Sequence, residues 1–430
     1  MCQPIIPASE PAPIEFAGKK VRESSMADDV VTFGDGLPPI PEKLLLARDR
    51  GEVLFITGAG ISRPAPSSLP DFRELVVQVY DRLDTAVAAK LHAIFKEEQK
   101  ARDAGSISRT SWRDYTAGLN AGQQAELRAF TGYEFDVVLG MLERRLDSGA
   151  SSASSMRKAV SEILARTRQT NELHVSLARL GQRFGRPFIA TTNFDALLGT
   201  AASRRKLSPK IYALGAMPRP SRRKEFEGIF HLHGALGKDD GASDLVLTDQ
   251  DFGDVYLRRR IAAEFIYDAA RIFHLVLVGY SLSDAPMRYL MNAIAGDETH
   301  FADIKARYAI IPVGNDNAVD IAYWQARGIV PIAYNQRDNH SQLRSLMRNW
   351  AESIPSPAND AWSRRQIRRI TSSTLEAASE ADRSLFRYLV RRATPSERES
   401  FAGLLRGGGA SARWLGYINE ITREDVAGPR

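Results

Sequence analysis

Short apolar runs rich in β-branched residues, each followed by turn-forming residues, recur through the middle of the chain. Several are apolar at every position, which is typical of strands buried on both faces of a parallel sheet. Stretches with helical spacing lie between most of them, so the pattern predicts an α/β fold with a doubly wound, mostly parallel sheet. The runs expected to form strands are 53–57, 187–191, 228–233, 245–248, 274–280, 307–313 and 328–334.

The first two expected strands are separated by about 130 residues, far more than a crossover between parallel strands requires. Most of this stretch has helical spacing and few strand-forming residues, so it predicts a helical insert at about 80–180. Such an insert would cover the strand ends where ligands bind in open α/β sheets.

The two ends of the chain differ from the main domain, which we expect at 41–350. Residues 1–40 begin with a stretch rich in Pro, Ser and Ala that has no hydrophobic period, which indicates a disordered tail. In 351–430, a Pro/Ser-rich linker precedes an Arg-rich amphipathic segment that we interpret as a small helical tail. That tail either binds a partner or another copy of the chain, or simply packs at the surface.

The amino-acid composition excludes several classes of protein. The net charge is +6, without a long Lys/Arg block, so nucleic-acid binding is allowed but not indicated. The single cysteine, Cys2, excludes an internal disulfide framework and a cysteine-built zinc site. No apolar run approaches the roughly 18 residues of a membrane span, and the N-terminus lacks the apolar segment of a signal peptide, so we expect a cytoplasmic protein.

The run 53–57 ends in Gly58-Ala59-Gly60, a tight turn that lets the backbone approach a phosphate. Dinucleotide-binding dehydrogenases add a third glycine and an acidic residue about 20 positions later. Here Arg63 occupies the third glycine position, and residues 78–80 offer no acid. The turn therefore does not have the features of a redox-cofactor site.

A polar loop with Asp71 and Arg73 follows this turn and precedes an apolar helix. A guanidinium group is a planar donor suited to diphosphate or ribose oxygens. Asp71 is equally suited to cap the helix.

Polar clusters also follow three later strands. Thr191 to Asp195 form one, with Asn193 as donor and acceptor and Asp195 as a negative charge; either side chain is also suited to capping a helix. His231 and His233 share another strand end. A metal pair lacks a nearby third ligand, so we favour His233 as a general base and His231 as structural. Gly279 and Ser281 to Asp284 form the third cluster, at the expected start of a helix.

The ordered set "GAGIS", "PDFR", "TxNxD", "HG" and "GxSL" on alternating strands resembles the sirtuin fold of NAD-consuming enzymes over roughly residues 45–350. The resemblance implies that Asn193, Asp195 and His233 are the catalytic residues, with His233 as the catalytic histidine. It implies NAD⁺ as substrate. The residues expected to bind it are Gly58, Ala59, Gly60, Ser62, Asp71, Phe72, Arg73, Thr191, Gly279, Ser281 and Leu282.

The departures from the family pattern are informative. Protein-deacylating sirtuins usually carry a four-cysteine zinc ribbon after the catalytic histidine, whereas this chain has no cysteine there, so no zinc is expected. Thr192 stands where deacylating sirtuins generally have glutamine, and Tyr280 where they usually have threonine. With the helical insert, these features resemble the bacterial sirtuin-like effectors of anti-phage defence, which hydrolyse NAD⁺.

The resemblance thus implies an NAD⁺ glycohydrolase in which Asn193 orients a water or the ribose hydroxyls, Asp195 stabilises positive charge or positions the ribose, and His233 is the general base. A protein deacylase or ADP-ribosyltransferase using the same site is one alternative, and a non-catalytic NAD or ADP-ribose sensor is another. The family also implies a homo-oligomer and an activating partner, such as a HerA-type ATPase.

Overall fold

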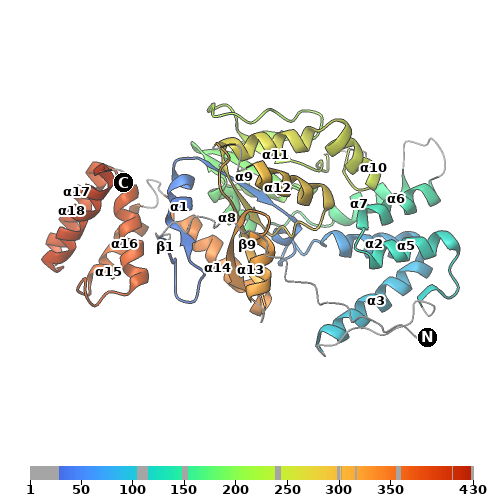
Figure 1. Cartoon of the computed structure of the whole chain (residues 1–430), viewed down its shortest axis with the longest axis horizontal. Coiled ribbons are helices and arrows are strands. Elements are labelled where there is room, and N and C mark those ends of the chain that lie inside the picture. Colours follow the sequence, from blue (N-terminus) through green and yellow to red (C-terminus); the bar gives the residue numbers. More distant parts are fainter. Residues whose placement is uncertain are drawn as a thin grey trace, which may run out of the picture.

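The computed structural model describes nine segments of the chain (Figure 1). They are residues 29–103, 115–147, 154–237, 244–297, 301, 303–314, 317–354, 360–408 and 410–427. Most of the expected N-terminal tail, residues 1–28, lies outside the described residues.

A mostly parallel sheet of eight strands forms the centre of the molecule, in the order β10-β9-β8-β3-β5-β7-β6, with β4 antiparallel to β5. Counted along the chain, the six main strands lie in the order 6-5-4-1-2-3, which is the doubly wound arrangement that the hydrophobic pattern predicts. The strands are β3 (Val53–Thr57), β4 (Gln182–Arg183), β5 (Arg186–Thr191), β6 (Ile211–Tyr212), β7 (Gly228–His231), β8 (His274–Val278), β9 (Arg307–Val313) and β10 (Ile329–Asn335).

The strand register brings the carboxyl ends of four central strands level with one another. Thr57 of β3 pairs with Thr191 of β5 on one side and with Val278 of β8 on the other. Thr191 in turn pairs with His231, the last residue of β7. The chain order reverses between β3 and β8, so the residues just after these strands converge where open α/β sheets bind ligands.

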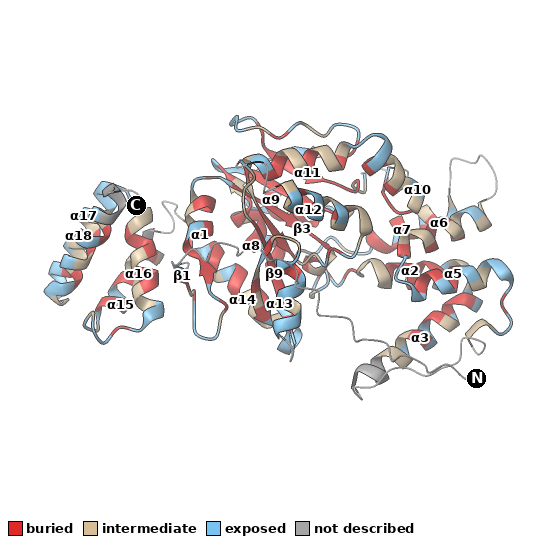
Figure 2. Ribbon diagram, viewed as in Figure 1, coloured by how far each residue is buried: buried red, intermediate tan, exposed pale blue. Residues whose placement is uncertain are grey.

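Helices cover both faces of the sheet because each buried strand presents apolar side chains to both sides. In β3, Val53 and Phe55 pack on one face, and Leu54 and Ile56 pack on the other. Figure 2 shows the strands buried between helices whose outer surfaces are exposed. The first face is covered by α1 (Glu42–Asp49), α8 (Glu172–Leu180), α9 (Leu197–Arg204) and α14 (Arg337–Ser353), and the second by α11 (Ile261–Ile272), α12 (Ala285–Asp297) and α13 (Asn317–Gln325).

The expected helical insert forms a module with its own core beside the carboxyl ends of the strands (Figure 1). Its core includes Val76, Leu127, Leu139 and Val160. The module consists of α2 (Phe72–Leu83), α3 (Thr85–Asp103), α5 (Ala121–Thr131), α6 (Phe135–Leu146) and α7 (Ser155–Leu164). The next helix, α8, returns to the sheet and packs against α14 and α9.

The C-terminal helices lie at the end of the molecule opposite the helical module (Figure 1). They pack around Trp414 and Phe386, whose ring centroids are 4.6 Å apart. Tyr388 donates to Asp49 of α1 at 2.9 Å, which ties them to the main domain. They are α15 (Asp360–Thr371), α16 (Glu380–Arg392), α17 (Pro395–Gly407) and α18 (Ala412–Ala427).

Two expectations are corrected by the fold. Residues 29–40, which we placed in the tail, form β1 (Val30–Val31) and reach β2 (Ile40–Pro41), because Val31, Phe33 and Ile40 are buried in the core next to α16. The run 245–248 is not a strand. Leu245 and Leu247 instead bury their side chains in the helical module.

Candidate active site

A cavity of about 860 Å³ opens at the carboxyl ends of the parallel strands, a size typical of small-molecule sites. All but three of the residues expected to bind or cleave NAD⁺ line it. The lining residues among them are Ala59, Gly60, Ser62, Asp71, Phe72, Arg73, Asn193, Asp195, His233, Gly279 and Ser281. Gly58, Thr191 and Leu282 lie just outside the lining.

Two of the three residues that do not line the cavity make contacts that support it. Thr191 accepts a hydrogen bond from the Asn193 amide at 3.0 Å, which holds the start of the polar turn. Leu282 is fully buried in the core on the second face of the sheet. The structure therefore gives Thr191 a hydrogen bond to the polar turn and gives Leu282 a place in the core.

The glycines after β3 and β8 permit two turns to touch. The Gly60 amide donates to the Gly279 carbonyl at 2.9 Å. A Cβ at Gly60 would lie 2.8 Å from that carbonyl oxygen, and one at Gly279, where φ is +60°, would lie 2.7 Å from the Ile61 nitrogen. Only glycine fits both positions, which explains why two motifs far apart in the sequence require it.

A buried polar network centred on Ser62 connects the turn after β3 to the turn after β5. Ser62 Oγ donates to Asp195 Oδ2 at 2.9 Å, and Asn193 Nδ2 donates to Ser62 Oγ at 3.1 Å. His174 Nε2 lies 3.1 Å from the same hydroxyl. Because His174 Nδ1 accepts from the Asn171 amide at 3.2 Å, the ring proton is on Nε2 and is donated to Ser62.

This network fixes the orientation of the Asn193 amide. Its Nδ2 faces Ser62, which leaves Oδ1 buried and without a hydrogen-bond partner among the described residues. A buried acceptor without a partner is costly unless a ligand or water satisfies it. Asn193 therefore offers one free, fixed acceptor at the cavity.

Asp195 also has a defined environment. Its Oδ1 accepts from the Leu197 amide at 2.9 Å and its Oδ2 from Ser62. Burial raises the pKa of this carboxyl, while these donors favour its charged form. The interaction with Leu197 places Asp195 at the start of α9, so it serves the helix end as well as the cavity.

The two histidines of the third motif have separate environments. His231 Nδ1 lies 2.9 Å from the Asn193 carbonyl oxygen, and burial lowers its pKa to about 4, which fits a structural role. His233 follows the end of β7 and lines the cavity. Burial lowers its pKa as well, so its ring is neutral near pH 7.

The loop before α2 has a different arrangement from the one we expected to hold a diphosphate. Asp71 caps α2 by accepting from the Glu74 amide at 2.9 Å, and Arg63 pairs with Asp71 and Glu74. The Arg73 guanidinium pairs with Glu98 of α3 at 2.6 Å and lies 4.1 Å from the Phe95 ring centroid. Both Asp71 and Arg73 line the cavity, but each also has a structural partner.

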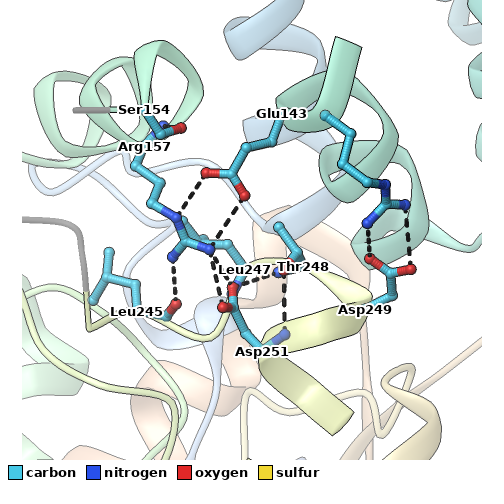
Figure 3. Close-up of polar contacts among 9 residues, drawn as sticks. Glu143, Ser154, Arg157, Leu245, Leu247, Thr248, Asp249 and Asp251 are labelled. Atoms are coloured by element: carbon cyan, nitrogen blue, oxygen red, sulfur yellow. Dashed lines mark hydrogen bonds and ion pairs between the residues drawn. The ribbon is translucent and has the colours of Figure 1, made fainter. Parts of the chain in front are cut away.

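A cluster of ion pairs joins the helical module to the segment that follows His233 (Figure 3). Arg157 of α7 pairs with Glu143 of α6 at 2.8 Å and with Asp251 of α10 (Asp249–Phe252) at 2.7 Å. It also donates to the Leu245 carbonyl at 3.0 Å. Arg144 pairs with Asp249 at 3.1 Å. The module is therefore anchored on the helix that borders the candidate histidine.

Several residues of the site were not found from the sequence. His174 lies 112 positions from Ser62, and Tyr256, whose hydroxyl oxygen lies 2.7 Å from His233 Nε2, is 23 positions from that histidine, so neither belongs to a local motif. A second part of the cavity is lined by residues of β9, β10 and α14. There, Tyr334 contacts His340, and three successive residues, Asp338, Asn339 and His340, have positive φ angles. These three residues interrupt the first turn of α14, a break that the spacing of apolar residues in the sequence does not reveal.

Comparison with known proteins agrees with this architecture. Residues 187–332 match the family model described as a SIR2-like domain. This match supports a sirtuin-like family.

The chain also aligns with an uncharacterized protein, y4cA, of Sinorhizobium fredii, with 30% identity over 401 residues. The alignment covers 88% of this chain but only 30% of that protein.

Two further observations concern metals and membranes. Within the described segments, no group of three or more His, Cys, Asp and Glu side chains is arranged to hold a metal ion. In the same segments, no helix has both the length and the apolar character needed to cross a membrane.

Proposed function

We propose that this protein is an NAD⁺ glycohydrolase, which cleaves NAD⁺ to nicotinamide and ADP-ribose. The observation that carries the proposal is Asn193 Oδ1, which has no hydrogen-bond partner among the described residues and is held at the cavity by the Ser62 network beside the Asp195 carboxyl. Hydrolysis needs an acceptor that orients one water and a negative group that stabilises the positive charge developing on the sugar. An oriented amide oxygen next to a carboxyl group supplies both.

Cleavage of NAD⁺ requires few catalytic groups from the protein. Nicotinamide is a good leaving group because the pyridinium nitrogen takes the electron pair of the breaking C1′–N bond and becomes neutral. A water oxygen then forms the new bond to C1′, and one of its protons passes to a base. Asn193 orients this water or the ribose hydroxyls, Asp195 stabilises the cationic sugar, and His233 accepts the proton.

The second part of the proposal concerns the biological setting. The helical module, the absence of cysteine after His233 and the residues Thr192 and Tyr280 resemble anti-phage defence effectors rather than protein deacylases. We infer that the enzyme depletes NAD⁺ in infected cells and that an oligomer or a partner, such as a HerA-type ATPase, controls it.

Incubation of the purified protein with NAD⁺ alone tests the proposal. We expect equal release of nicotinamide and ADP-ribose, and loss of both in Asn193→Ala. Asn349→Ala is a matched control, since Asn349 donates to the Phe33 carbonyl and does not line the cavity. Product release only when an acylated peptide is added would favour a deacylase. Tight NAD⁺ binding without turnover, under conditions that include the activating partner, would favour a sensor.

A further inference from the structure

His233 has a hydrogen-bond partner that is not part of any recognised motif. Its Nε2 lies 2.7 Å from the Tyr256 hydroxyl oxygen, and both side chains are buried. Phe252 packs against both rings, with its centroid 5.2 Å from that of His233 and 5.9 Å from that of Tyr256. The contact is therefore enclosed on several sides and protected from competing water.

This contact leaves one ring nitrogen for chemistry. His233 lines the cavity, whereas Tyr256 is not among its lining residues. Within the described segments, Nδ1 of His233 has no hydrogen-bond partner, and Nε2 is occupied by Tyr256. Any proton that His233 takes from a bound molecule must accordingly arrive at Nδ1.

Burial and one carboxylate shift the pKa values of both groups. Burial lowers the pKa of His233, so the ring is neutral, and burial raises the pKa of Tyr256, so the phenol keeps its proton. The charge of Asp284 acts on both groups, raising both pKa values. The neutral imidazole carries one proton; when Nε2 carries it, the Tyr256 oxygen 2.7 Å away is its acceptor and Nδ1 keeps a free lone pair.

We propose that Tyr256 accepts the Nε2 proton of His233 and thereby holds the ring with an unprotonated Nδ1 as the base that faces the cavity. This inference rests on the proposed function. During hydrolysis, the water oxygen bonds to C1′ while its proton moves to Nδ1, and nicotinamide leaves with the electron pair of the C1′–N bond. Asp284 stabilises the resulting imidazolium, which then releases its proton to solvent.

The fold holds Tyr256 in place by an uncommon device. Tyr256 belongs to η2 (Gly253–Arg258), a turn of π-helix between α10 and α11. The extra residue in each turn of a π-helix changes the direction of the side chains, and such turns often occur at functional sites. Asp254 pairs with Arg258 and Arg259 within this turn, and Arg157 of α7 fixes α10, which precedes it.

Asp284 is similarly fixed. It accepts from the Met287 amide at 3.1 Å at the start of α12, and the Tyr280 hydroxyl donates to its other oxygen. These two hydrogen bonds fix the orientation of the carboxyl group. Tyr256 and Asp284 therefore act as positioning residues for His233.

Nitrogen NMR of protein labelled at histidine tests the proton assignment directly, since protonated and unprotonated ring nitrogens have distinct shifts. His233→Gln identifies the resonances of His233. We expect Nε2 protonated and Nδ1 unprotonated near pH 7 in the wild type, and a mixture of tautomers in Tyr256→Phe. A single Nδ1-protonated form in the wild type would overturn the proposal. Because this experiment needs no turnover, it can fail or succeed independently of the NAD⁺ hydrolase activity.

Kinetics provide the second test in an enzyme that cleaves NAD⁺. Tyr256→Phe should lower kcat by about tenfold or more, because an incorrect tautomer removes the base. The KM for NAD⁺ should stay near the wild-type value. Asp284→Asn, which retains a capping oxygen but loses the charge, should also lower kcat. Tyr388→Phe removes an equally buried hydroxyl far from the cavity and should leave kcat unchanged. A wild-type kcat in Tyr256→Phe would contradict the assignment.

Discussion

Removal of the Ser62 hydroxyl is a sharp test of the buried network. Ser62→Ala leaves three partners behind: Asp195 Oδ2, Asn193 Nδ2 and His174 Nε2, which lie 2.9, 3.1 and 3.1 Å from the hydroxyl oxygen. A hydrogen bond to a charged group contributes roughly 1.5–3 kcal/mol and one between neutral groups about 1 kcal/mol. Because Ser62 borders the cavity, water can replace part of the lost hydrogen bonding. We therefore expect the free energy of unfolding to fall by about 2–4 kcal/mol.

Urea unfolding of ligand-free protein measures this loss. Ser353→Ala is the matched control, because Ser353 is also buried but donates only to the Trp350 carbonyl, at 2.8 Å. We expect the control to lose about 1 kcal/mol. The kcat for NAD⁺ cleavage should fall in Ser62→Ala alone, because Asn193 loses the partner that orients it. Equal stability losses in the two variants, together with unchanged kcat, would refute the role of the network.

Three other predictions follow from the structure. Burial lowers the pKa of His174 and His231 to about 4, below the usual value near 6.5, so the unfolded chain binds more protons and stability should fall between about pH 6.5 and pH 4. Urea unfolding across this range should show a shallower pH dependence in His231→Gln, and an unchanged slope would contradict it. Arg157→Met should lower the free energy of unfolding by about 2–3 kcal/mol, since the partly buried guanidinium of Arg157 joins two carboxylates. An unchanged thermal unfolding midpoint would count against the anchoring role. Glu98→Gln should preserve NAD⁺ cleavage if Arg73 serves the substrate, whereas Arg73→Ala should weaken it; equal kinetic effects of the two changes would mean that Arg73 only tethers α3.

The sheet and the location of the site could be predicted because strong local signals specify them. Buried parallel strands leave apolar runs, and their carboxyl ends leave clusters such as Thr191 to Asp195. The run 245–248 carries the same signal but is not a strand: Leu245 and Leu247 pack in the helical module, whereas Val246 packs in the core under the sheet. Apolar character indicates burial, and it does not by itself identify the partner that covers a segment.

The contacts that orient the site could not be predicted. His174 reaches Ser62 only because α8 returns beside the first turn, and Tyr256 reaches His233 only through the π-helical turn. Asp71, by contrast, fits both of the roles that its sequence position suggests. Capping and ligand binding were both suggested by its position, and the structure combines a helix cap with a place on the cavity wall.

Hydrolysis of NAD⁺ in isotopically labelled water tests the central claim most directly. The account predicts that each nicotinamide released is matched by one ADP-ribose with a labelled oxygen at C1′, and that Asn193→Ala loses this product while Asn349→Ala retains it. Nicotinamide release without label in ADP-ribose, or the same labelled product from Asn193→Ala at the wild-type rate, would contradict the assignment of Asn193 as the residue that directs water to the sugar.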